Sequence, residues 1–414
     1  MGADDDVVIT SIGMVSPGGI GVGAYRQAVL EGRSGVGPIT QFKADDLPVK
    51  IAGMVTQDVA GLMGAQEIPQ TSRASQLVLV AATECMGTGD AVKARMEPDP
   101  SRVGVVMGVC SSGLEVLVQE LEVMRTQGPA HLFSGAVPQL MDNGAAALTA
   151  LRYGARGPSW CVATACATSM DCLGLAYDLI KSGRVDAVIA GGGDAAVTRF
   201  AISAFGNARA LSRNNENPSM ASRPFDLDRD GFVMAEAAGV FFLERRSRAE
   251  KRGAKTIARL CGYGTTNDAH HLTSPRPDGS GLASAMQLGI QQAGIAPSDV
   301  GYISAHATST EQGDVAEAAA IKAVFGAHAD TVMVGATKSI FGHSIGGAGA
   351  ISSLAAVLAV GEGILTPVVS FRTPDPACPL NVFNTTKTGQ SVRYAMANAA
   401  GFGGQNSTLV FGAP

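Results

Sequence analysis

Short apolar runs recur along the chain, and each is followed by a glycine-rich turn and a segment of small residues. Residues 7–10 lead to a turn at 16–19, residues 103–108 follow a proline, and residues 186–190 end in three glycines. Near-continuous apolar strands are what a parallel sheet covered on both faces requires. Because such strands alternate with helical segments, the sequence predicts an α/β fold.

Two segments, 160–181 and 332–360, have similar patterns of residues. Each begins as an apolar strand, passes through a turn and continues as a helix of small residues. A glycine follows each helix, Gly183 in one case and Gly361 in the other, and glycine commonly ends a helix. This repeated pattern predicts a duplicated architecture of two similar halves. The predicted halves are residues 1–255 and residues 256–414.

The composition excludes several classes of protein. The 414 residues include 31 lysines and arginines against 36 aspartates and glutamates, a net charge of −5. This balance provides neither the basic surface that binds nucleic acid nor a basic belt for an anionic membrane. With 46% hydrophobic and 16% charged residues, the chain is globular rather than disordered. Aromatic residues make up only 5%, so small aliphatic side chains must fill the core.

Cysteine usage and the distribution of apolar residues predict a cytoplasmic protein. The seven cysteines show no paired C-x-x-C spacing, which favours a reducing compartment. The first residues are acidic where a signal peptide would be basic. The longest uncharged run, 344–361, is rich in glycine, serine and alanine, which favours a helix buried in protein over one that spans lipid.

Cys166 is the first candidate for chemistry, because it lies where a predicted strand gives way to a helix. Backbone N–H groups and the positive end of the helix dipole favour a thiolate at such a place. The neighbouring residues are small, and an adjacent N–H can receive a developing oxyanion. Taken alone, a free cysteine is more often a small core residue, as we expect of the other six.

Two histidines and a lysine at predicted strand ends strengthen the case for an active site. His306 follows the apolar run 300–305, and Lys338 and His343 bound the turn after the run 332–337. Chemistry in α/β proteins is concentrated at such strand ends. Several cofactor motifs fail: no phosphate loop, no complete dinucleotide fingerprint and no Cys/His spacing for zinc is present. We therefore expect no nucleotide cofactor and no metal.

The motifs around these residues resemble one family in order and spacing. They are Thr164–Ser169, His306–Asp314 with Glu317, 338–347, 401–404 and the linking stretch 221–232. Together they resemble the β-ketoacyl-[acyl-carrier-protein] synthases, in particular the KAS II enzymes of fatty-acid synthesis and the ketosynthases of type II polyketide synthesis. The resemblance covers essentially the whole chain. It implies the thiolase fold, with two α/β halves in five alternating layers, and a dimer across the sheet edges.

The resemblance also implies a reaction, the decarboxylative Claisen condensation of an acyl chain with malonyl-ACP. Cys166 would take the acyl group from a carrier thioester, and the N–H groups of Cys166 and Phe402 would form the oxyanion hole. His306 and His343 would stabilise the enolate that remains after loss of CO2. The substrates would arrive on the phosphopantetheine arm of an acyl carrier protein, so no further cofactor is expected.

Supporting roles follow for residues around this centre. Lys338 would hold His306 in place, and Glu317 would neutralise that lysine. Thr308 and Thr310 match positions that bind the pantetheine arm. Phe402 matches a gate that moves as the acyl pocket fills.

This chain departs from the family pattern at several positions. Ala307 replaces a usual glycine, and Ser352 replaces a glutamate of the lysine network. Ser111 and Ala400 stand where relatives often carry bulkier residues in the acyl pocket. We therefore expect a pocket suited to wider or more polar chains, as in polyketide or polyene synthesis, although drift in an ordinary KAS II enzyme explains the same residues.

Partners follow from the same resemblance. Carrier proteins of this family are acidic, and Arg209 and Arg213 are candidates for docking one in trans. The chain would form a homodimer, or the active half of a heterodimer with a chain-length-factor-like homologue. Three other classes stay open: a chain-length factor itself, a coenzyme A thiolase and a cysteine hydrolase. The cysteine, the lysine and the two histidines together favour the ketosynthase.

Overall fold

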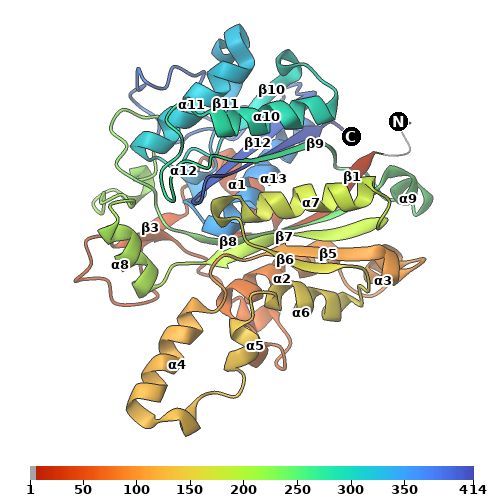
Figure 1. Cartoon of the computed structure of the whole chain (residues 1–414), viewed down its shortest axis with the longest axis vertical. Helices are drawn as coiled ribbons and strands as arrows, with labels where there is room; N and C mark the ends of the chain where they lie inside the picture. Colours follow the sequence, from red (N-terminus) through yellow and green to blue (C-terminus); the bar gives the residue numbers. More distant parts are fainter. Residues whose placement is uncertain (1–5) are drawn as a thin grey trace.

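A mixed sheet of eleven strands runs through the computed structural model, which describes residues 6–414 (Figure 1). Five strands of the first half lie in the order β6-β5-β7-β8-β1, five of the second half in the order β11-β10-β12-β13-β9, and β2 pairs with β1. A short ladder between β1 and β9 joins the two sets. The first set is β1 (Val7–Ser16), β2 (Gly19–Ile20), β5 (Val103–Gly108), β6 (Ser159–Val162), β7 (Ala187–Ala195) and β8 (Glu236–Arg245). The second set is β9 (Ala258–Asn267), β10 (Val300–Ser304), β11 (Met333–Gly335), β12 (Tyr394–Gly401) and β13 (Gln405–Gly412).

The two sets of strands have the same topology. In the first, β5 pairs in parallel with β6 and β7, and β8 runs antiparallel to β7 and β1. In the second, β10 pairs in parallel with β11 and β12, and β13 runs antiparallel to β12 and β9. Taken in chain order, each half therefore places its strands as third, second, fourth, fifth and first. The predicted duplication is confirmed.

Two helices occupy equivalent places in the halves and form the central layer of the fold. They are α7 (Thr168–Lys181) and α13 (Ala348–Glu362), and each follows the third strand of its half. They approach closely, because a Cβ at Gly349 would lie only 2.6 Å from the backbone nitrogen of Met170. Figure 1 shows them between the two sets of strands. The uncharged run is therefore a core helix, as predicted: the apolar stretch Ile345–Glu362 is 89% buried.

The outer layers complete the five-layered arrangement. On the first set lie α2 (Arg73–Met86) and α6 (Gly144–Tyr153), and on the second α10 (Ser280–Ala293) and α11 (Glu311–Phe325). One boundary was predicted wrongly: α13 passes through Gly361 and ends at Glu362, and the following Gly363 has a left-handed φ of 66°. The remaining elements are α1 (Val22–Glu31), α3 (Asp90–Met96), α4 (Leu114–Gln127), α5 (Ala136–Leu140), α8 (Arg199–Asn207), α9 (Arg246–Lys251), α12 (Lys338–Phe341) and the hairpin β3 (Val36–Pro38) with β4 (Ile51–Gly53).

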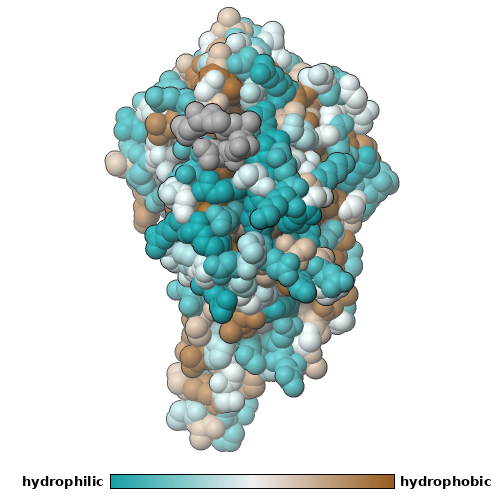
Figure 2. Space-filling view, turned by 90° about the vertical axis from the view of Figure 1, so that its right-hand side faces the viewer, coloured by the Kyte–Doolittle hydropathy of each residue, from teal (hydrophilic) through white to brown (hydrophobic). Residues whose placement is uncertain are grey.

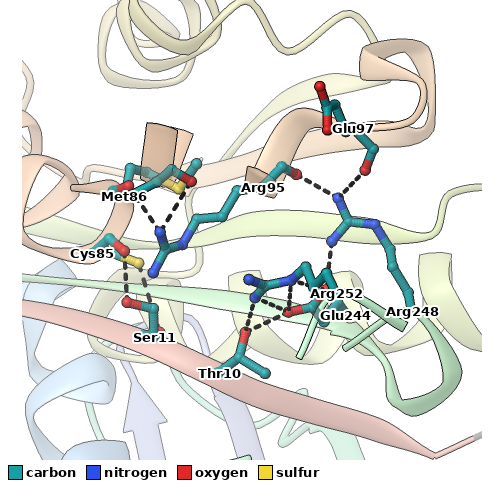
Figure 3. Close-up of polar contacts among 10 residues, drawn as sticks. Thr10, Ser11, Cys85, Met86, Arg95, Glu97, Glu244, Arg248 and Arg252 are labelled. Carbon is teal, nitrogen blue, oxygen red and sulfur yellow. Dashed lines mark hydrogen bonds and ion pairs between the residues drawn. The ribbon is translucent and has the colours of Figure 1, made fainter. Parts of the chain in front are cut away.

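A buried carboxylate at the end of β8 ties several elements together (Figure 3). Glu244 accepts hydrogen bonds from Arg248 and Arg252, each at 2.5 Å, and from the Thr10 hydroxyl. Both guanidinium groups also lie within 6 Å of the Phe242 ring. Burial alone would raise the pKa of Glu244, but the bonds and charges of these partners hold it below its usual value.

Replacing Glu244 with glutamine is expected to lower the free energy of unfolding at pH 7 by about 3 kcal/mol, because the arginines lose their buried counter-charge. A carboxylate whose pKa is lower in the folded state stabilises the folded protein at pH values above the usual glutamate pKa of about 4.3. This stabilisation is lost as the pH falls through the pKa of the folded state. The difference between variant and wild type should therefore shrink in acid. Urea unfolding at pH 7 and at lower pH measures it.

The matched control is Glu250→Gln, a neutralised carboxylate that is exposed on the neighbouring helix α9. It should change stability by no more than about 0.5 kcal/mol. Equal stabilities of the two variants would contradict the role given to Glu244.

Candidate active site

Side chains from both halves meet in a cavity of about 720 Å³. Cys166 lies on the short helical turn Ala165–Ala167 between β6 and α7, His306 follows β10, and His343 follows α12. All three line the cavity. The carboxyl ends of β5, β10 and β12 open into it as well, which is where α/β folds usually place their sites.

The turn that carries Cys166 has an unusual backbone. Ala165 has a φ of 50°, a left-handed conformation that a residue with a Cβ adopts at a cost. The end of β12 presses against this turn: a Cβ at Gly401 would lie 2.8 Å from the Thr164 carbonyl oxygen and 3.0 Å from the Cys166 nitrogen. A glycine is therefore required there. The close approach brings the backbone N–H of Phe402 to the thiol.

The thiol of Cys166 is protonated in the resting structure. Burial raises its pKa to about 11, although the charge of Lys338 and the N–H of Phe402 act in the opposite direction. The prediction that the helix start favours a thiolate is therefore wrong for the free protein. The reason is physical: the second half of the chain covers the turn and removes the water that would solvate the charge.

His343 is the partner of this thiol. Its Nε2 lies 3.1 Å from Cys166 Sγ. The rings of His306 and His343 are 5.7 Å apart at their centroids and nearly perpendicular, at 88°. Burial and the nearby charge of Lys338 hold the pKa of both imidazoles well below their usual value. Both rings are therefore neutral at physiological pH. Within the described residues no hydrogen bond reaches Nδ1 of either ring, so the protein fixes neither tautomer.

Lys338 and Glu317 hold the loop that carries His306. The ammonium of Lys338 donates to the carbonyl oxygen of His306 at 2.5 Å. The Glu317 carboxylate accepts from the backbone N–H groups of His306, at 2.8 Å, and Ala307, at 2.6 Å. Burial lowers the pKa of Lys338 to about 8, against the raising effect of the negative charge of Glu317. Both side chains thus hold the His306 loop by binding its backbone: Lys338 binds a carbonyl oxygen, and Glu317 binds two N–H groups.

Most of the other residues selected from the sequence line the same cavity. They are Thr308, Thr310, Ser111, Ala400, Phe402 and Arg209. The hydroxyls of Thr308 and Thr310 lie 2.9 Å apart. Arg213 does not line the cavity; it is exposed, and its backbone N–H binds Asp230.

Ala307 and Ser352, the two departures from the family pattern near Lys338, lie in a strained backbone position and a buried position respectively. Ala307 has a φ of 29°, so a residue with a Cβ occupies a strained backbone position beside His306. Ser352 is buried, and its hydroxyl faces that of Thr337 at 3.4 Å.

Sequence reasoning missed two polar residues of the site. Asp194, at the end of β7, accepts from the N–H of Gly346 at 3.2 Å, and burial raises its pKa to about 7. Asn398 on β12 donates to Glu317 at 3.3 Å. The available signal was a polar residue in an otherwise apolar strand, near the end of β7 for Asp194 and in the middle of β12 for Asn398, but the partners of each are far away in sequence.

Comparison with known proteins agrees with this geometry. Residues 4–249 match the family model of the β-ketoacyl synthase N-terminal domain, and residues 257–372 match that of the C-terminal domain. The chain is 38% identical over 406 residues to 3-oxoacyl-[acyl-carrier-protein] synthase 2 of Synechocystis, covering 98% of this chain and 97% of that protein. It is 37% identical over 412 residues to the protein of the same name from Staphylococcus aureus strain COL, covering 99% of each.

Solved structures show the same likeness. One is a type II PKS acyl-carrier protein in complex with its ketosynthase bound to the hexaketide, with a TM-score of 0.90 and 32% identity over 99% of each chain. Another is the ishigamide ketosynthase/chain length factor, with a TM-score of 0.90 and 30% identity over 99% of each chain. The expected thiolase fold is thereby confirmed, and the chain belongs to the β-ketoacyl synthase family.

Proposed function

We propose that this β-ketoacyl-[acyl-carrier-protein] synthase carries its acyl chain on Cys166 and uses His306 and His343 for the condensation with malonyl-ACP. The observation that carries the proposal is the 3.1 Å contact between Cys166 Sγ and His343 Nε2, with His306 facing the same cavity. A nucleophile with an adjacent base is the arrangement that acyl transfer requires.

In the first half-reaction the thiol attacks the carrier thioester. Because the pKa of Cys166 is about 11, the proton must leave as the bond forms, and the neutral His343 ring accepts it at Nε2. The N–H groups of Cys166 and Phe402 bind the tetrahedral oxyanion. The thioester C–S bond then breaks, and the proton passes to the carrier thiolate as it leaves.

In the second half-reaction malonyl-ACP loses CO2, and the electron pair of the broken C–C bond forms an enolate. His306 and His343, each in the tautomer with its proton on Nε2, donate to the enolate oxygen. His343 therefore changes tautomer between the half-reactions, which is possible because no hydrogen bond from the described residues holds its Nδ1. Their depressed pKa values suit this role, since a neutral ring stabilises the charge without protonating the carbon. The enolate carbon attacks the acyl group, the C–S bond breaks, and its electron pair leaves on the Cys166 thiolate. A proton from solvent then restores the resting thiol.

The partner surfaces fit a carrier protein and a second synthase subunit. Arg209 lies at the cavity mouth, where an acidic carrier protein would dock in trans. The edge strand β6 exposes Trp160, and the lobe of α4 and α5 exposes several apolar side chains, visible in brown on the narrow lower lobe of Figure 2. We assign this surface to a homodimer or to a heterodimer with a chain-length-factor-like homologue, in the cytoplasm. The mass in solution, with and without that homologue, separates the two assemblies.

The acyl end of the cavity is lined by two small residues, Ser111 and Ala400. Such a pocket admits wider or more polar chains than a bulky aliphatic lining allows, which favours polyketide or polyene intermediates. An ordinary KAS II enzyme would instead prefer saturated straight chains. Intact mass spectrometry after incubation with a panel of acyl-ACPs distinguishes the two, and peptide mapping tests whether the retained acyl group lies on Cys166.

Replacing Ser111 with isoleucine is expected to shorten the acyl chains that are accepted. The added carbons occupy the cavity, so transfer of the longest chains should slow by about 10- to 100-fold while short chains react at nearly the wild-type rate. The acyl-ACP panel measures this. Ser111→Ala, which keeps the space, is the control, and an unchanged chain-length profile in the isoleucine variant would contradict the assignment.

A further inference from the structure

A buried carboxylate in the helix that follows the nucleophile has no role in the reaction described above. Asp171 lies in the first turn of α7, five residues after Cys166, and only 4% of its surface is exposed. Its Oδ2 accepts a hydrogen bond from the Thr164 hydroxyl at 2.5 Å, and its Oδ1 accepts one from the Tyr263 hydroxyl at 2.9 Å. The Ser407 hydroxyl faces the same carboxylate. All three groups are neutral hydroxyls, and those of Thr164 and Tyr263 donate the hydrogen bonds.

The arrangement joins the two halves of the chain. Thr164 and Asp171 belong to the first half, whereas Tyr263 is on β9 of the second. The Tyr263 ring lies flat on α7, because a Cβ at Gly174 would be 2.3 Å from two of its ring carbons. The hydroxyl therefore reaches Asp171 from a ring that cannot easily move.

Thr164 connects the carboxylate to the nucleophile. It directly precedes Ala165, the residue with the left-handed backbone, and its carbonyl oxygen accepts from the N–H of Ala167 at 3.0 Å. Its own N–H donates to the Thr168 hydroxyl at 2.8 Å. Fixing the Thr164 side chain therefore fixes the start of the turn whose second residue is Cys166. Strained backbone of this kind persists only where surrounding contacts determine it.

We infer that Asp171 and Tyr263 are positioning residues, which hold the strained turn through Thr164 and so set Cys166 Sγ at its distance from His343. The inference rests on the proposed role of Cys166 as nucleophile. A carboxylate is costly to bury without a cation, and burial raises its pKa. An apolar side chain would fill this space at less cost, so the two hydrogen bonds from Thr164 and Tyr263 indicate a geometric requirement beyond packing.

Thr164→Val tests the inference, because valine has the shape of threonine without the hydroxyl. The rate of Cys166 alkylation by iodoacetamide and the rate of acyl transfer from acyl-ACP should each fall by about tenfold. The KM for acyl-ACP should stay near that of wild type, since no contact with the carrier changes. Asp171→Asn and Tyr263→Phe should act in the same direction, and Thr164→Ser should restore the rate.

Tyr177→Phe is the matched control. The Tyr177 hydroxyl also joins α7 to β9, by a bond to the Cys261 carbonyl oxygen at 3.3 Å, but it lies farther along the helix from the nucleophile. Its loss should leave the alkylation rate unchanged. A folded Thr164→Val protein that reacts at the wild-type rate would overturn the inference, as would Thr164→Ser reacting as slowly as Thr164→Val. A wild-type protein that is not acylated on Cys166 would instead overturn the proposed function.

Discussion

Replacing Cys166 with alanine should abolish retention of an acyl group from acyl-ACP and lower the rate of condensation by a factor on the order of 10⁴ or more. The expected loss is large because the sulfur is the atom that forms the covalent bond, and no water-based route replaces it in a cavity of this kind. Intact mass spectrometry of the protein after incubation with acyl-ACP measures retention directly.

Cys110 provides the matched control for this experiment. It lines the same cavity, and its thiol is committed to hydrogen bonds with the Ala165 carbonyl oxygen and the Thr168 hydroxyl. The Cys110→Ala variant should therefore retain the acyl adduct. An adduct of equal mass on wild type and on Cys166→Ala would show that the nucleophile is assigned wrongly.

The alanine variant also separates the two half-reactions. His306 and His343 remain in place in Cys166→Ala, so the protein should still release CO2 from malonyl-ACP while making no condensation product. A decarboxylation assay measures the CO2. This outcome would place the two chemical steps on different side chains of one cavity.

Replacing His306 or His343 with alanine should lower the rate of condensation by about 100- to 1,000-fold, the usual cost of losing one donor to a developing oxyanion. The two variants should differ in the first half-reaction. His343 lies 3.1 Å from Cys166 Sγ, so His343→Ala should also slow acylation, whereas His306→Ala should spare it. Single-turnover acylation and decarboxylation assays distinguish these effects.

Asparagine at either position is the control, because its amide N–H retains a donor and should recover part of the decarboxylation rate.

The pH profile provides a second measurement. Since burial lowers the pKa of both imidazoles, they should remain neutral as the pH falls through 6.5, and the condensation rate should show no acid limb there. Equal acylation rates in the two alanine variants would contradict the separate roles.

The candidate residues of the site were accessible from the sequence because each stands in a local pattern, and the resemblance to the family supplied their expected roles. Cys166, His306, Lys338 and His343 each follow an apolar run at a turn, and strand ends are where α/β proteins place such groups. The similar patterns of segments 160–181 and 332–360 likewise predicted the duplication. In the structure these segments form β6 with α7 and β11 with α13, which occupy equivalent places in the two halves. The end of α13 was misjudged because Gly361 and Gly363 give the same local signal, and only packing selects between them.

The ionisation state of Cys166 could not be predicted from the neighbouring residues. A helix start favours a thiolate when the sulfur faces water, and nothing in the residues around it reveals that a distant segment covers it. The end of β12 lies against the turn from more than 200 positions away along the chain, and burial raises the pKa of the thiol more than Lys338 and the backbone N–H groups lower it.

The sequence by itself therefore determined the α/β class, the two equivalent halves and the candidate side chains that meet in the cavity, because periodicity and motif spacing are properties of short segments. Only the tertiary structure decided that the thiol rests protonated beside a neutral imidazole, that Asp194 and Asn398 belong to the site, and that Asp171 meets Tyr263 from the other half. Each of these depends on contacts between segments far apart in the chain, and solvation and hydrogen bonding are fixed only when those segments pack.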